Sequence, residues 1–95
     1  MSYYISTKIA ATTFEEAIEK TTAALKEQGF GVLTTIDMKA TLKAKIDKDI
    51  EPYTILGACN PKFASQALEA ENNIGVFLPC NVVVKQTKNG FEAVA

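Results

Sequence analysis

Hydrophobic and polar positions alternate with a period of two in several separate parts of the chain, which is typical of half-buried β-strands. In the first part, Ile5 and Ile9 share one face of such a strand, and Ser6 and Lys8 share the other. The alternation predicts strands at residues 3–9, 30–36, 53–58, 74–78, 82–86 and 91–95. Because both faces of 30–36 are largely apolar, we expect that strand to be central in the sheet.

A helical period replaces the alternation in three other segments, and each begins with a residue that can cap a helix. Thr13 and Glu16 have the spacing of a capping box, in which each side chain bonds the backbone N–H of the other. Asp37 and Asn60 are suitable N-caps for the next two helices, and Pro61 suits the first helical position. We therefore expect helices at 13–28, 37–46 and 61–71. In the last of these, four apolar residues are predicted to face inward, Phe63, Ala64, Ala67 and Leu68.

Glycine and proline indicate where these elements end. Gly29 can adopt the left-handed conformation that terminates the first helix. Pro79 cannot donate to a strand ladder, so residues 79–81 are predicted to form a bulge or kink. Asn89-Gly90 is typical of a tight hairpin turn between antiparallel strands. Together these elements predict a two-layer α+β domain with three helices on one face of a mixed, mostly antiparallel sheet.

Composition places the chain among globular proteins. It has 95 residues, of which 47% are hydrophobic and 22% charged, so one domain with a thin core is expected. No apolar run approaches the ~18 residues of a membrane-spanning helix, and the N-terminus lacks the features of a signal peptide. We therefore expect a cytoplasmic protein with no membrane partner.

The charged residues exclude several kinds of chemistry. Net charge is −1, and all ten basic residues are lysines, which disfavours nucleic acid as a partner. The absence of histidine removes the commonest general base and metal ligand. A site made of cysteine ligands alone would need four thiolates and hence two chains, so we expect no metal and no cofactor.

The two cysteines stand in the same sequence context, since Cys59-Asn60 and Cys80-Asn81 each follow a predicted strand or bend. Cys59 lies just before a helix N-terminus, where the helix dipole favours a thiolate. The alternative for both cysteines is that they are small buried hydrophobic residues. Without secretory features we expect free thiols, which could form a redox pair only if their Cα atoms lie within about 7 Å.

Asparagine and lysine side chains supply the remaining candidates. The amides of Asn60 and Asn81 either satisfy backbone groups at the turns or line a shared pocket. Lys45 belongs to a cluster on the second predicted helix that could attract an anionic ligand, with Lys39, Lys43 and Lys48. The alternative is a solvated face neutralised by the neighbouring Asp47 and Asp49.

Three segments, residues 28–45, 52–61 and 74–84, closely resemble the prokaryotic family catalogued as domain of unknown function 302. The positions that match its motifs are Gly29, Gly31, Asp37, Lys45, Gly57, Cys59, Asn60, Pro61, Pro79, Cys80 and Asn81. The resemblance implies a compact α+β fold with a layout like that of the TATA-binding-protein-like domains, and commonly a homodimer. It implies no established reaction and no DNA binding, because function belongs to sites rather than folds.

The chain departs from the family at its C-terminal end. Members usually continue past the final strand into an Asp-Pro turn and a closing helix, whereas this sequence stops at Ala95. We therefore expect residues 1–95 to form a single α+β domain lacking that helix. A face or edge of the sheet would then be left uncovered, which favours pairing with a second subunit.

Two functional hypotheses follow from these residues. The first is a non-catalytic homodimeric module that binds a small molecule or a protein near the two Cys-Asn turns. The alternative is a thiol-dependent redox or sulfur-transfer protein, with Cys59 as the nucleophile and Cys80 as its resolving partner. A third possibility is a purely structural dimerisation unit.

Overall fold

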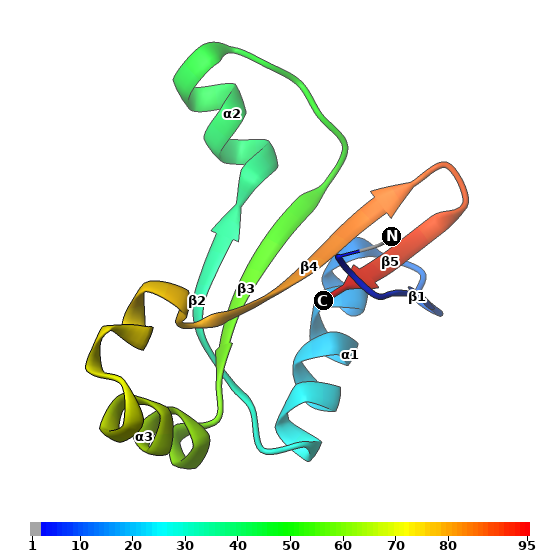
Figure 1. The fold of residues 1–95 in the computed structure, drawn as a ribbon. Helices are drawn as coiled ribbons and strands as arrows, with labels where there is room; N and C mark the ends of the chain where they lie inside the picture. Colours follow the sequence, from blue (N-terminus) through cyan, green and yellow to red (C-terminus); the bar gives the residue numbers. More distant parts are fainter. Residues whose placement is uncertain (1–2) are drawn as a thin grey trace.

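The computed structural model describes residues 3–95, which form an open five-stranded sheet with helices on one side (Figure 1). The elements in chain order are β1 (Ser6–Ile9), α1 (Phe14–Glu27), β2 (Gly31–Asp37), α2 (Met38–Ile46), β3 (Tyr53–Cys59), α3 (Pro61–Ala70), the 3₁₀-helix η1 (Asn72–Phe77), β4 (Cys80–Thr87) and β5 (Gly90–Val94). The strands lie in the order β1-β5-β4-β3-β2. The α+β class is confirmed. A mixed, mostly antiparallel sheet was expected, and each of the four pairings is antiparallel.

The three predicted helix starts are confirmed. Side-chain oxygens of Thr13, Asp37 and Asn60 each accept a hydrogen bond from the backbone N–H three residues later, over 3.1, 2.9 and 3.1 Å. Such a bond satisfies one of the free N–H groups at the start of a helix. Gly29 has a φ of 85°, as expected for the residue that ends α1.

Helix α1 packs across one face of the sheet and makes the core. The buried cluster consists of Ala17 from α1, Leu56 from β3 and Val84 from β4. Partly buried residues surround it, namely Ile9, Ala11, Phe14, Ile18, Val32, Val82 and Phe91. Among residues 3–95 the fully buried hydrophobic residues number only four, the fourth being Ala58, so the core is as thin as the length implies.

Two predictions about strands are wrong. Residues 74–78 were expected to be extended, but Asn72–Phe77 forms η1, which begins where the Glu71 carboxylate accepts the Asn73 N–H over 3.0 Å. Strand β3 pairs with β2 on one side and with β4 on the other, so residues 74–78 do not pair with it. Strand β2 was expected to be central, but it is an edge strand.

One of the two predicted bends occurs as expected, and the other only in part. Pro79 forms a bend, but Cys80 and Asn81 pair with β3 in unbroken register, so the bulge or kink expected over residues 79–81 is confined to Pro79. The hairpin between β4 and β5 is confirmed, with Lys88 and Asn89 in the turn and Gly90 starting β5 at a φ of 122°. These bends fix where β4 starts and ends.

The face of the sheet turned away from α1 carries a row of aliphatic residues. Ile36, Ile55, Val83 and Val94 are successive register partners across β2, β3, β4 and β5. Residues that lie opposite one another in antiparallel strands point to the same face. The row therefore lies opposite the face that contains Leu56, because Leu56 follows Ile55 directly in β3.

Glu16 links the start of α1 to the preceding residues. Its carboxylate accepts a hydrogen bond from the Thr12 hydroxyl over 2.8 Å and another from the Thr12 N–H over 3.4 Å. These bonds, followed by the contact with Lys20, hold the pKa of Glu16 below its ordinary value of 4.5. The predicted capping box is thus half formed, since Glu16 bonds Thr12 instead of Thr13.

This depressed pKa predicts an acid-dependent contribution to stability. The contribution is complete above the unfolded-state pKa and is lost as pH falls through the lower folded-state pKa. Glu16→Gln should therefore flatten the dependence of the unfolding free energy on pH below 4.5, as measured by urea titration at several pH values. Glu19→Gln, which removes an exposed carboxylate of the same helix, is the control; equal flattening by both variants would contradict the assignment.

Candidate functional site

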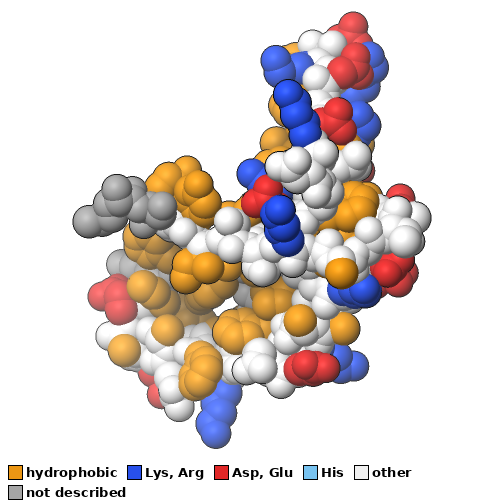
Figure 2. All heavy atoms as spheres, turned by 90° about the vertical axis from the view of Figure 1, so that its right-hand side faces the viewer, with side chains coloured by type: hydrophobic (Ala, Val, Ile, Leu, Met, Phe, Trp, Pro, Cys, Tyr) orange, Lys and Arg blue, Asp and Glu red, His pale blue; other side chains and the backbone are white. Residues whose placement is uncertain are grey.

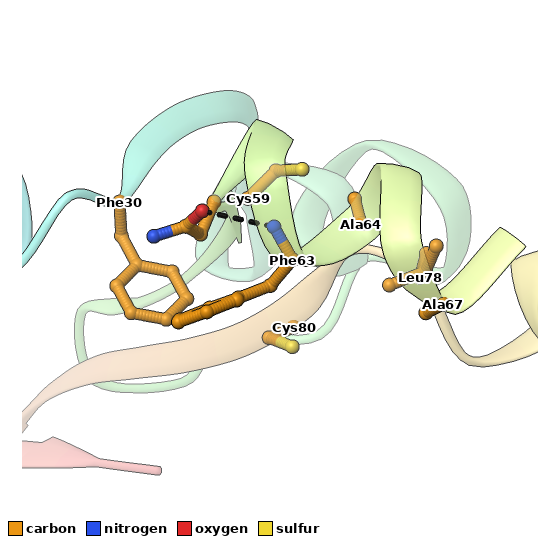
Figure 3. A pocket seen from close by; sticks show the side chains of 8 residues that line it. Phe30, Cys59, Phe63, Ala64, Ala67, Leu78 and Cys80 are labelled. Atoms are coloured by element: carbon orange, nitrogen blue, oxygen red, sulfur yellow. Dashed lines mark hydrogen bonds between the residues drawn. The ribbon is translucent and has the colours of Figure 1, made fainter. Parts of the chain in front are cut away.

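Both cysteines and Asn60 line one cavity of about 250 Å³ (Figure 3). It lies between α3 and the neighbouring ends of β3 and β4. Its lining residues are Phe30, Cys59, Asn60, Phe63, Ala64, Ala67, Leu78 and Cys80. The structure thus brings together three of the five residues singled out from the sequence, Cys59, Asn60 and Cys80.

Pairing of β3 with β4 explains why the two turns converge. Ala58 is the register partner of Cys80, and Gly57 is the partner of Asn81, so β3 ends beside the start of β4. Gly57 is buried, and a Cβ at this position would collide with the Thr34 side chain and lie 2.7 Å from the Pro79 ring. Only glycine lets the proline ring lie this close to β3, directly before Cys80.

The two thiols line the same cavity but do not face each other. Both cysteines are free, Cys59 half-buried and Cys80 exposed. Cys80 shares a face with its partner Ala58, and Cys59 is the next residue along β3, so the two side chains leave the sheet on opposite faces. Figure 3 shows the two sulfur atoms apart from each other, with that of Cys59 beside α3 and that of Cys80 beside β4.

The two asparagines have different positions. Asn60 lines the cavity and also caps α3, because its Oδ1 accepts the Phe63 N–H over 3.1 Å. Asn81 lies in β4 and lines a neighbouring cavity of about 330 Å³, which shares only Phe30 and Cys80 with the first. The amides of Asn60 and Asn81 therefore do not line one pocket.

Lys45 is remote from both cavities. It belongs to α2, which extends from one end of β2, whereas α3 lies at the other end of the β2–β3 pair (Figure 1). On the same helix, Lys43 forms ion pairs with Asp47 over 2.8 Å and with Asp49 over 3.4 Å. These pairs are mostly solvent-exposed and contribute little stability, about 0–1 kcal/mol each. The interpretation of this cluster as a self-neutralising face is confirmed for Lys43.

Sequence analysis missed the aromatic wall of the cavity. Phe63 was expected to face inward, but its side chain is 60% exposed and forms part of the cavity wall. Phe30 was expected where the chain leaves the first helix and enters a strand, yet its side chain lines the same cavity as that of Phe63 (Figure 3). The sequence feature that could have indicated this wall is Phe63, an aromatic residue three positions after the N-cap Asn60 and therefore in the first turn of the helix.

Fold and site define a small two-layer α+β domain with one apolar, thiol-lined cavity at a strand end. A family model described as domain of unknown function DUF302 matches residues 5–94, so the chain belongs to this family. A crystal structure of an uncharacterized conserved DUF302 protein from Bacillus stearothermophilus is similar, with a TM-score of 0.89 and 31% sequence identity. The match covers 99% of this chain and 73% of that one. No functionally curated protein matches the sequence.

Asn60 provides a test that separates helix capping from other roles. Asn60→Ala should destabilise the protein by about 1 kcal/mol, because the Phe63 N–H loses its acceptor. Asn60→Asp keeps an acceptor at the same place and should be nearly neutral. Chemical denaturation of both variants measures the difference. Equal destabilisation by alanine and aspartate would show that the cap bond is not what stabilises α3.

Proposed function

We propose that this protein is a non-catalytic homodimeric module of the cytoplasm that binds a small molecule at the cavity between Phe30, Phe63 and the two cysteines. The observation that carries the proposal is the convergence of Cys59, Asn60 and Cys80 on one concave, apolar site. Concave apolar sites with a few polar groups are the usual form of ligand pockets. Two free thiols are in keeping with a reducing compartment.

Surface area supports the homodimer. The chain exposes 6941 Å², whereas a compact chain of this length exposes about 5,400 Å². Its radius of gyration is 14.7 Å, against about 12.4 Å for a compact domain of 95 residues. The excess of about 1,500 Å² exceeds the ~800 Å² per partner buried in a standard protein interface.

The face of the sheet turned away from α1, where Tyr3 and Tyr4 lie beside Val83 and Val94, is the surface we assign to the second copy. It carries the aliphatic row of Ile36, Ile55, Val83 and Val94, and Tyr53 of β3 lies on the same face. The charged helix α2 projects from the body, and Figure 2 shows hydrophobic side chains gathered below this arm. Two such faces related by a two-fold axis would pack aliphatic rows together, as in a β-sandwich.

Ile36→Lys tests this interface. Ile36 is 44% exposed on an edge strand, so lysine is tolerated in a monomer but would place a charge in the dimer contact. We expect the dimer dissociation constant to rise at least tenfold in sedimentation equilibrium experiments at several concentrations. Ile5→Lys is the matched control, because Ile5 is 80% exposed and bonds Ala95, which places it on the other face. A wild-type protein that sediments only as a monomer would refute the homodimer.

The alternative function is thiol chemistry, because Cys59 and Cys80 line the same cavity. Oxidised glutathione would convert the two thiols to a Cys59–Cys80 disulfide and be reduced to two molecules of glutathione. The separated sulfurs argue against this reaction.

Mass spectrometry after incubation of the native protein with oxidised glutathione decides between the two functions. We expect no intramolecular disulfide, and at most a mixed disulfide at the exposed Cys80. The Cys80→Ser variant shows which thiol forms the mixed disulfide. Rapid formation of the Cys59–Cys80 bond without unfolding would favour the redox function instead.

A further inference from the structure

The walls of the cavity restrict the chemistry of its occupant. Two aromatic rings, Phe30 and Phe63, and aliphatic groups of Ala64, Ala67 and Leu78 make most of the lining. Within residues 3–95 no charged side chain lines it, and its polar groups are the two thiols and the Asn60 amide. A charged ligand would lose hydration without gaining a partner of opposite charge, which disfavours binding.

The volume restricts the size of the occupant. A dry apolar cavity of about 150 Å³ holds a molecule as large as benzene. Pockets for drug-sized ligands measure about 300–1,000 Å³. The cavity of about 250 Å³ lies between these cases and fits one ring with a short substituent, about eight to ten non-hydrogen atoms.

Two further features fit such a ligand. The Phe63 side chain is 60% exposed although it is aromatic and lines the cavity, so a bound ring would cover apolar surface that now faces water. The Asn60 carbonyl oxygen already accepts the Phe63 N–H, and its NH₂ group, which lies next to Gly29, is the group of this side chain that can donate to a ligand acceptor.

We propose that the cavity binds an uncharged molecule with a single ring and one hydrogen-bond acceptor. The ring packs between Phe30 and Phe63, and the acceptor lies beside the Asn60 amide. This inference rests on the proposed ligand-binding function and adds the class of ligand.

Three probes with the same ring and different charge test the proposal: benzyl alcohol, benzoate and benzylamine. Each is titrated into the ¹⁵N-labelled full chain, and binding is followed by the shifts of the Ala64, Ala67 and Cys80 amide signals. Benzyl alcohol should give saturable shifts with a dissociation constant of about 0.1–1 mM, as expected for a ligand of eight heavy atoms. Benzoate and benzylammonium should bind at least tenfold more weakly.

Cavity-filling variants locate the binding. Ala67→Leu replaces a half-buried lining methyl with a larger side chain that a helix accommodates well, and it should weaken benzyl alcohol at least tenfold. Ala70→Leu makes the same change at an exposed position of α3 that does not line the cavity, and it should bind as the wild type does. Ala64→Leu serves as a second filling variant if Ala67→Leu does not fold.

The outcomes separate the ligand class from the proposed function. Binding of benzoate or benzylammonium at these amides as tightly as benzyl alcohol would overturn the uncharged class and leave a ligand-binding module in place. Absence of saturable shifts with all three probes would overturn both the ligand class and the proposed ligand-binding function. Equal loss of binding in Ala67→Leu and Ala70→Leu would place the probe outside the cavity and overturn the assignment.

Discussion

The antiparallel register between β3 and β4 positions both the core and the candidate site. Strand β3 is largely apolar on both faces, so burial of its hydrophobic side chains alone does not distinguish this register from one shifted by a single residue. Shape does distinguish them, because the Pro79 ring needs Gly57 beneath it. In a shifted register the ring would meet the side chain of Leu56 or Ala58. The glycine–proline contact therefore selects the register that places Leu56 against α1 and brings Cys80 to the same cavity as Cys59.

Features that depend on neighbouring residues could be predicted from the sequence. The three helices follow from caps at Thr13, Asp37 and Asn60, each of which bonds a backbone group three residues away. The prediction of a strand at 74–78 is wrong because a strand needs a neighbouring strand with which to pair. The alternation of apolar residues does not show which strands are available. The convergence of the cysteine turns was predicted, but the aromatic wall was not, since Phe30 and Phe63 meet only through the tertiary fold.

The error about β2 has a physical explanation. Apolar residues on both faces of a strand indicate that both faces are covered, and within one chain this usually means a central position. Here β2 is an edge strand, and its Ile36 is nearly half exposed on the face turned away from α1. The apolar pattern on both faces of β2 is explained if a second copy of the chain covers the exposed face. Hydrophobic periodicity reports the total burial of a strand, including burial that arises only on assembly.

The cavity joins two parts of the fold that are otherwise weakly connected. Helix α3 packs chiefly against η1, and these two contribute Phe63, Ala67 and the adjoining Leu78 to one wall. The other wall comes from the ends of β3 and β4 and from Phe30, which precedes β2. A molecule held between the walls adds contacts between the α3–η1 unit and the sheet. Because regions with few buried contacts open most easily, binding at this position would stabilise the least anchored part of the chain. The aliphatic row lies outside this cavity, so the proposed ligand binding and the proposed dimerisation would use separate surfaces of the same small domain.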